Sequence, residues 1–134
     1  MSAVAEMLAP FRGTGDLLPD FLVRSGRQLA LAELQLAADA QLIDLDDPAV
    51  LVAESLRPSI VATGQRSVTQ AYALSEFQRH TDAAGLRWWP TLEASWIQVT
   101  LFDRAVAELG VQDVRTLAID DEPVTAAASY LGLM

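Results

Sequence analysis

Two stretches of this chain have different hydrophobic periods, and that difference limits the fold more than any other feature. Within residues 68–77 the apolar side chains are three or four positions apart, which is the spacing of one face of an α-helix. Residues 96–102 alternate apolar with polar side chains, as a half-buried strand does. The helical and strand-like stretches follow no regular strand–helix–strand order, so the sequence predicts an α+β fold.

Local signals place the other elements. Ser2 is a candidate cap for a short opening helix, and Ser67 with Gln70 has the pattern of a capping box. The segment from Gly26 to Leu45 fits a helix by propensity and two strands by alternation, and we favour two strands. The remaining expected elements are helices over 49–56, 67–80 and 123–131, a polar loop over 57–66, and strands over 86–89 and 114–119.

The composition fits one globular domain over residues 1–134. Apolar residues make up 51% of the chain, so a continuous core can form without disulfides. Cysteine is absent, which excludes a thiol nucleophile, a thiolate metal site and a disulfide framework, and fits a reducing compartment. No export signal opens the chain, and no apolar run approaches the roughly 20 residues that span a bilayer. We therefore expect a soluble, cytoplasmic protein with no membrane partner.

The charge of the chain limits its partners. The formal net charge is −9, and all nine basic residues are arginine. This balance repels phosphate backbones at long range, so we expect no nucleic-acid partner. A few arginines in one pocket still suit a small anionic ligand, and the acidic surface suits a basic protein partner.

Few residues offer the usual ligands for a metal. His80 is the only histidine, so sites built on several histidines are excluded, and its position near a helix end favours a cation stabilised by the helix dipole. Asp44, Asp46 and Asp47 offer oxygen ligands, but their position just before Pro48 favours a helix start. We therefore predict no metal site.

Arg87 next to Trp88 and Trp89 is the most informative group of residues. A guanidinium beside large aromatic faces suits a flat ligand that carries phosphate, with charge from the arginine and stacking from an indole. The alternative is structural: one tryptophan packs in the core, and Arg87 pairs with an acid. The composition alone favours the structural alternative.

Residues 85–105 resemble the RES family. Gly85 to Trp89 is similar to the family's Gly-(Ile/Leu)-Arg-(Tyr/Trp)-x-Ser motif, and Leu101 to Ala105 is similar to its Leu-Phe-Asp/Glu-Arg-Ala motif. Four further segments resemble family motifs in the same order along the chain: Ala3–Met7, Leu42–Asp47, Thr69–Ala73 and Tyr130–Leu133. Each motif is short, but the ordered set covers nearly the whole chain.

The resemblance implies a fold and an activity. RES proteins are similar to ADP-ribosyltransferases, so it implies a mixed sheet core with flanking helices. Active members are toxins that degrade NAD by cleaving its nicotinamide–ribose bond, and they are usually paired with an antitoxin protein. It implies Glu6 as the catalytic carboxylate, and Arg87, Trp88 and Thr91 as substrate-binding residues. NAD is the expected substrate, and no other cofactor is expected.

The chain also departs from the family pattern. Pro90 stands at the position of the family's serine and offers neither a hydroxyl nor an N–H group, although Thr91 is adjacent. The family's arginine and its first strands lie upstream of the segment that contains Glu6, so we expect a shortened domain with an exposed sheet edge that favours homo-oligomers. The alternative function is a non-catalytic RES relative that binds a nucleotide or a partner protein.

Overall fold

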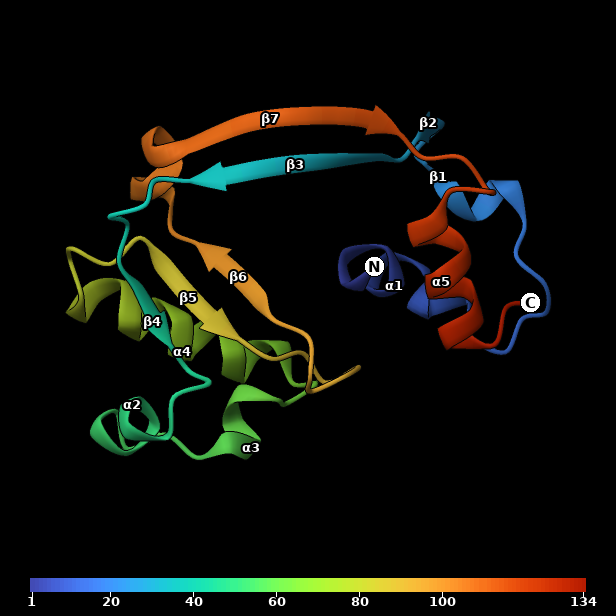
Figure 1. Cartoon of the computed structure of the whole chain (residues 1–134). Coiled ribbons are helices and arrows are strands. Elements are labelled where there is room, and N and C mark those ends of the chain that lie inside the picture. Colours follow the sequence, from blue (N-terminus) through green and yellow to red (C-terminus); the bar gives the residue numbers. More distant parts are fainter. The chain divides into compact units, whose positions relative to one another are not determined.

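The computed structural model describes residues 1–134, and the chain divides into two compact units. Unit 1 comprises Met1–Leu34 and Val111–Met134, and unit 2 comprises Gln35–Gly110. Helices and strands occur in both units, which confirms the predicted α+β class (Figure 1). No helix combines the length and the apolar character needed to cross a bilayer.

In unit 1, helix α1 (Ser2–Leu8) packs against helix α5 (Glu122–Leu131). The buried residues of α5 are three or four positions apart, and two of them are alanines that let the helices approach closely: Val124, Ala127, Ala128 and Leu131. Gly132, at φ +70°, ends α5 as predicted, and the N–H of Leu133 donates to the Ala128 carbonyl. The prediction that Ser2 caps the opening helix is wrong, because Ser2 lies within α1 and makes no capping hydrogen bond.

The strands of unit 1 begin with a tight hairpin of β1 (Val23–Arg24) and β2 (Arg27–Gln28). Ser25 and Gly26 between them both have positive φ, as the two-residue hairpin turn requires. Strand β3 (Ala30–Leu36) pairs with β7 (Leu109–Thr116) in a separate two-stranded sheet, and two residues of each strand belong to unit 2. The preference for strands over a helix in residues 26–45 is therefore confirmed, whereas the last strand begins five residues before its predicted start at Val114.

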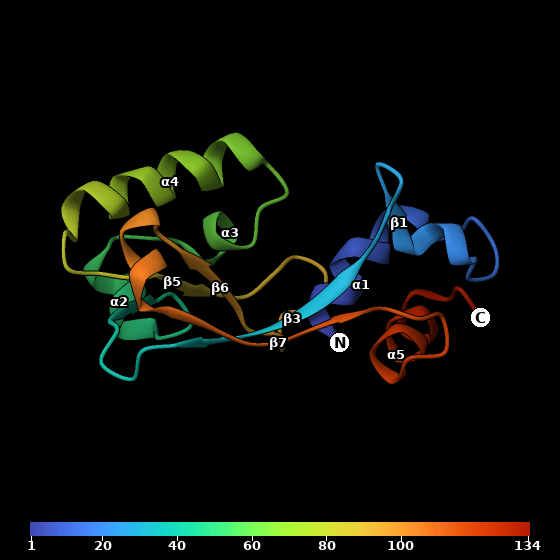
Figure 2. The ribbon, with the colours of Figure 1, turned by 90° about the horizontal axis from the view of Figure 1, so that it is seen from above.

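Unit 2 contains a three-stranded sheet in the order β4–β5–β6. Strand β4 (Leu42–Asp44) is parallel to β5 (Gly85–Trp88), and β6 (Gln98–Leu101) is antiparallel to β5, as predicted for the hairpin. Helices α2 (Pro48–Ala53), α3 (Pro58–Val61) and α4 (Arg66–Arg79) connect β4 to β5. Figures 1 and 2 show α4 along one face of this sheet.

The core of unit 2 lies between α4 and the sheet. Ala83, Leu86 and Phe102 are buried there, and Ala73 and Phe77 of α4 pack against them. The Phe77 and Phe102 rings meet edge to face, with 5.3 Å between their centroids. These contacts fix the height of α4 above the sheet, and with it the position of every side chain that α4 directs toward the strands.

Several predictions on α4 and its surroundings are wrong. The helix begins at Arg66 rather than Ser67 and has no side-chain cap, and the Thr69 hydroxyl donates to the Arg66 carbonyl instead. Leu74 was expected on the buried side but is 55% exposed. The predicted polar loop over 57–66 contains α3, which begins at Pro58, a residue whose fixed φ suits a first helical turn.

We predict that Gly85→Ala destabilises unit 2, because β6 approaches β5 closely at this residue. A Cβ on Gly85 would lie 2.2 Å from the Thr100 carbonyl oxygen, and neither backbone can move without disturbing the ladder. We expect the free energy of unfolding, measured by urea denaturation, to fall by about 1–3 kcal/mol. Gly64→Ala is the control, because nothing lies within 4 Å of its Cβ position. Equal urea midpoints for the two variants would contradict the prediction.

Candidate functional site

A cavity of about 410 Å³ lies in unit 2, between the sheet and helices α3 and α4. The sheet supplies Leu86, Trp88 and Thr100, and α3 supplies Ile60 and Val61. Leu86 and Trp88 are two positions apart on β5, so their side chains leave the same face of the sheet. The Trp88 indole N–H donates to the Thr100 hydroxyl at 3.0 Å, which fixes the orientation of the indole ring at the cavity wall.

Helix α4 supplies the polar part of the cavity lining. Arg66, Thr69, Gln70 and Ala73 lie on one face of the helix because they are three or four positions apart. Among the lining residues, Arg66 is the single charged one, and it begins α4, where the positive end of the helix dipole also favours an anion. Sequence reasoning missed Arg66, although its spacing to Thr69 and Gln70 signalled the shared face.

Tyr72 is the second aromatic residue of the lining. Its burial, followed by the negative charges of Glu76 and Glu54, raises the pKa of Tyr72 far above the ordinary value for a phenol. Tyr72 therefore stays neutral, and its hydroxyl oxygen is buried. The cavity lining thus combines an oriented indole, a second aromatic ring and one guanidinium.

Arg87 does not line this cavity. Strand alternation turns its side chain away from Leu86 and Trp88, and its guanidinium nitrogen lies 2.7 Å from both carboxylate oxygens of Asp44 on β4 and 3.4 Å from Asp46. The hydrogen bonds to Asp44 raise the pKa of Arg87 above its ordinary value. The structural alternative is therefore confirmed in both parts, because Arg87 pairs with an acid and Trp88 packs against the buried cluster of Ala83, Leu86 and Phe102.

The other predicted site residues lie in different places. Thr91 is exposed in the loop after β5, beside buried Pro90, and is not part of the cavity lining. Glu6 lies on α1 in unit 1, with its side chain exposed. Of the four residues, Trp88 is the one that reaches the cavity, and Glu6 belongs to a different unit from Arg87, Trp88 and Thr91.

The aspartates before α2 have structural roles. The Asp47 carboxylate accepts a hydrogen bond from the Ala49 N–H at 2.8 Å, which confirms the predicted helix start at Pro48. Asp44 and Asp46 instead hold Arg87. These three carboxylates are therefore committed to contacts within the chain.

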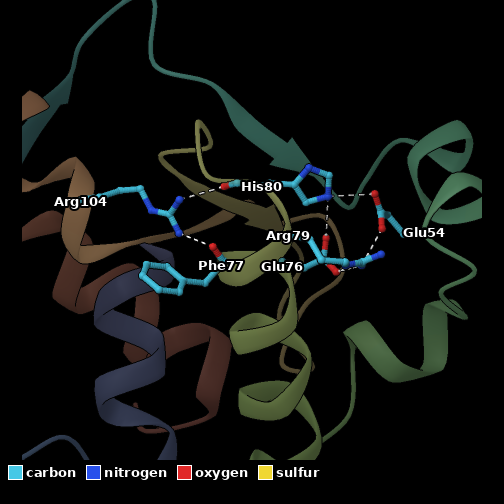
Figure 3. A network of polar contacts seen from close by, with 6 residues as sticks. All are labelled: Glu54, Glu76, Phe77, Arg79, His80 and Arg104. Atoms are coloured by element: carbon cyan, nitrogen blue, oxygen red, sulfur yellow. Dashed lines mark hydrogen bonds and ion pairs between the residues drawn. The ribbon is translucent and has the colours of Figure 1, made fainter.

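A second polar group lies at the other end of α4 (Figure 3). We name Glu54, Glu76 and His80 the Glu–His cluster; Glu54 follows α2, and Glu76 and His80 are one turn apart at the end of α4. Glu76 is fully buried, and Arg79 forms ion pairs with both glutamates. His80 Nε2 lies 3.2 Å from Glu54 Oε1 and 3.3 Å from Glu76 Oε2.

The expected position of His80 at the helix end is confirmed, since it is the first residue after α4. The burial of Glu76 was missed, because a glutamate on a predicted helix normally faces solvent. Its partners explain the burial: Arg79 follows three residues later and His80 four residues later, and Arg79 also pairs with Glu54, which follows a different helix. The spacing of Tyr72, Glu76 and His80, four residues apart each time, is the one signal in the sequence that placed them on a common face.

We predict that Arg87→Met lowers the thermal midpoint and does so less in 1 M salt than in 20 mM salt. Without the guanidinium, Asp44 and Asp46 face each other unpaired, and salt screens the repulsion between partly exposed carboxylates. Arg12→Met, which removes an exposed arginine of unit 1, is the control. If the thermal midpoint falls by the same amount at both salt concentrations, the ion pair is not the role of Arg87.

Comparisons with known proteins identify no relative of the chain. No protein-family model, no curated protein and no solved structure matches it. The chemistry of the cavity and of the polar residues around it, together with the short sequence motifs, is therefore the basis for assigning a function.

Proposed function

We propose that the chain is a RES-type domain that binds NAD in the cavity of unit 2. The observation that carries this proposal is the arrangement of Trp88 and Arg66 around one hollow, with an aromatic face on the sheet and a cation at the start of α4. Its volume of about 410 Å³ falls within the range of about 300–1,000 Å³ in which proteins bind small molecules.

Each part of a nucleotide has a matching group in this lining. The Trp88 indole offers a π face for a nicotinamide or adenine ring, and its hydrogen bond to Thr100 reduces the entropy cost of stacking. Arg66 and the N-terminal end of α4 suit a phosphate, which accepts paired hydrogen bonds from a guanidinium. Thr69 and Gln70 are the uncharged polar residues that α4 adds to the lining, and they suit ribose hydroxyls.

The RES resemblance supports the same ligand, because some of the residues that carry it also line the cavity. Thr69, Gln70, Tyr72 and Ala73 come from the Thr-Gln-x-(aromatic)-Ala motif, and Leu86 and Trp88 come from the Gly-(Ile/Leu)-Arg-(Tyr/Trp) motif. The parallel β4–β5 pair next to the antiparallel β5–β6 pair is compatible with a mixed, ADP-ribosyltransferase-like core. As in RES toxins, the expected protein partner is an antitoxin, and the net charge of −9 suits one with a basic surface.

Beyond binding, the RES resemblance implies that the chain cleaves the nicotinamide–ribose bond of NAD. The transition state develops positive charge on the ribose, and a nearby carboxylate stabilises that charge. No aspartate or glutamate lines the cavity, so the carboxylate has to come from elsewhere, and Glu6 is the residue that the family pattern assigns. Binding requires unit 2 alone, whereas cleavage also requires Glu6 to reach the bound dinucleotide.

We predict that the wild-type chain binds NAD in isothermal titration calorimetry and that Trp88→Ala weakens binding at least about 5-fold. Loss of one stacking face removes roughly 1–3 kcal/mol of binding free energy. Arg66→Gln is expected to weaken binding of NAD and AMP but not of nicotinamide, because its contact is with phosphate. Arg87→Gln is the matched control, since that arginine faces away from the cavity and should leave NAD affinity unchanged. No heat with millimolar NAD, or equal effects of Arg66→Gln and Arg87→Gln, would reject the cavity as the site.

We predict that the wild-type chain releases nicotinamide from NAD and that Glu6→Ala slows the release about 100-fold or more without changing NAD affinity. Chromatography with and without phosphate measures the rate and identifies the acceptor. Glu33→Ala, which removes an exposed glutamate of β3 in unit 1, is the control. Unchanged release by Glu6→Ala would remove this residue from the mechanism. No release from a wild-type chain that binds NAD would leave the non-catalytic binding function.

A further inference from the structure

The Glu–His cluster contains a contact pattern that hydrogen bonding alone does not satisfy. Two carboxylate oxygens, Glu54 Oε1 and Glu76 Oε2, face the same imidazole nitrogen, His80 Nε2, at 3.2 and 3.3 Å. An imidazole nitrogen carries at most one hydrogen, so it cannot donate fully to both oxygens. Glu76 Oε2, His80 Nε2 and the hydroxyl oxygen of Tyr72, which neighbours Glu76, are buried atoms that lack a hydrogen-bond partner with good geometry.

The remaining oxygens of both carboxylates are already used. Arg79 Nη2 lies 2.7 Å from Glu54 Oε2 and also contacts Glu76 Oε1. The guanidinium therefore fixes the two carboxylates so that their other oxygens point toward His80, as Figure 3 shows. In metal sites, residues outside the set of ligands commonly orient the ligand atoms through hydrogen bonds. Arg79 is placed to orient Glu54 and Glu76 in this way.

The separations match those between ligands of one metal ion. Ligands about 2.0–2.1 Å from a tetrahedral centre lie about 3.3 Å from one another. The three ligand atoms lie within 4.8 Å of one another, and the two contacts of His80 are at 3.2 and 3.3 Å. The third pair is Glu54 Oε1 and Glu76 Oε2. If these two oxygens moved closer together, the three atoms would form one face of a tetrahedral site, with the fourth position open to water.

The charge of the cluster also favours a cation. Two carboxylates share one guanidinium, and Glu76 carries its charge in a fully buried position. Burying an uncompensated charge is costly, so an additional cation stabilises the group.

We infer that Glu54, Glu76 and His80 bind a divalent transition-metal cation, with zinc as the expected ion. One nitrogen and two carboxylate oxygens suit Zn²⁺, Mn²⁺ or Fe²⁺ and are unfavourable for Mg²⁺ or Ca²⁺, which prefer oxygen ligands alone. The sequence excluded sites with several histidines and favoured a helix start for the aspartates before Pro48. It gave no signal that the single histidine would lie beside Glu54 and Glu76, which come from different parts of unit 2.

Metal titration of the EDTA-treated, full-length chain tests this inference independently of NAD. We expect one equivalent of Zn²⁺ to bind in calorimetry and to raise the thermal midpoint by at least about 5 °C at saturating zinc. Co²⁺ should give visible absorption bands of a low-coordinate site with nitrogen ligation. Mg²⁺ at the same concentration should leave the midpoint unchanged.

Variants separate this site from adventitious binding and from a plain ion-pair network. His80→Gln and Glu54→Gln remove partly exposed ligands, and each should weaken Zn²⁺ binding at least 100-fold and abolish the Co²⁺ bands. Glu108→Gln, an exposed glutamate of the same unit, is the matched control and should bind as the wild type does. No zinc binding by the wild type identifies an ion-pair network only and overturns the inference. Equal binding by the wild type and His80→Gln overturns it as well.

Discussion

The attachment of α4 to the sheet of unit 2 is the interaction on which both candidate sites depend. Phe77 packs edge to face on Phe102, and the Arg104 guanidinium lies 3.9 Å from the centre of the Phe77 ring. Arg104 also donates to the backbone carbonyls of Phe77 and His80, so one side chain covers the aromatic contact and satisfies the open end of the helix (Figure 3). The arginine of the Leu-Phe-Asp-Arg-Ala motif is thus a structural residue.

Because α4 is fixed in this way, its two ends present different chemistry. Arg66, at the first turn, faces the cavity with the positive end of the helix dipole behind it. Glu76 and His80, at the last turn, face Glu54 from α2. The electrostatics agree with these assignments, since an anionic ligand is favoured at the start of the helix and a cation is favoured at its end.

Hydrophobic period predicted the elements that have one apolar face, and it failed where polar contacts decide burial. The positions of α4, α5 and the β5–β6 hairpin follow from spacing and local signals. The burial of Glu76 does not, because it depends on ion-pair contacts with Arg79 and His80, and the period of apolar residues contains no information on such contacts. The same limit applies to Arg87, whose partner Asp44 became adjacent through the parallel pairing of β4 and β5.

The proposed NAD-binding function depends most on the Trp88 indole as the stacking surface for the dinucleotide. The indole N–H signals of the three tryptophans, resolved by ¹⁵N NMR, test this claim directly during a titration with NAD. We expect the Trp88 signal to shift progressively until the site is saturated with NAD, because the Trp88 N–H lies at the cavity wall beside Thr100. A titration in which the Trp88 signal stays still while the signal of Trp89 or Trp96 moves would contradict it.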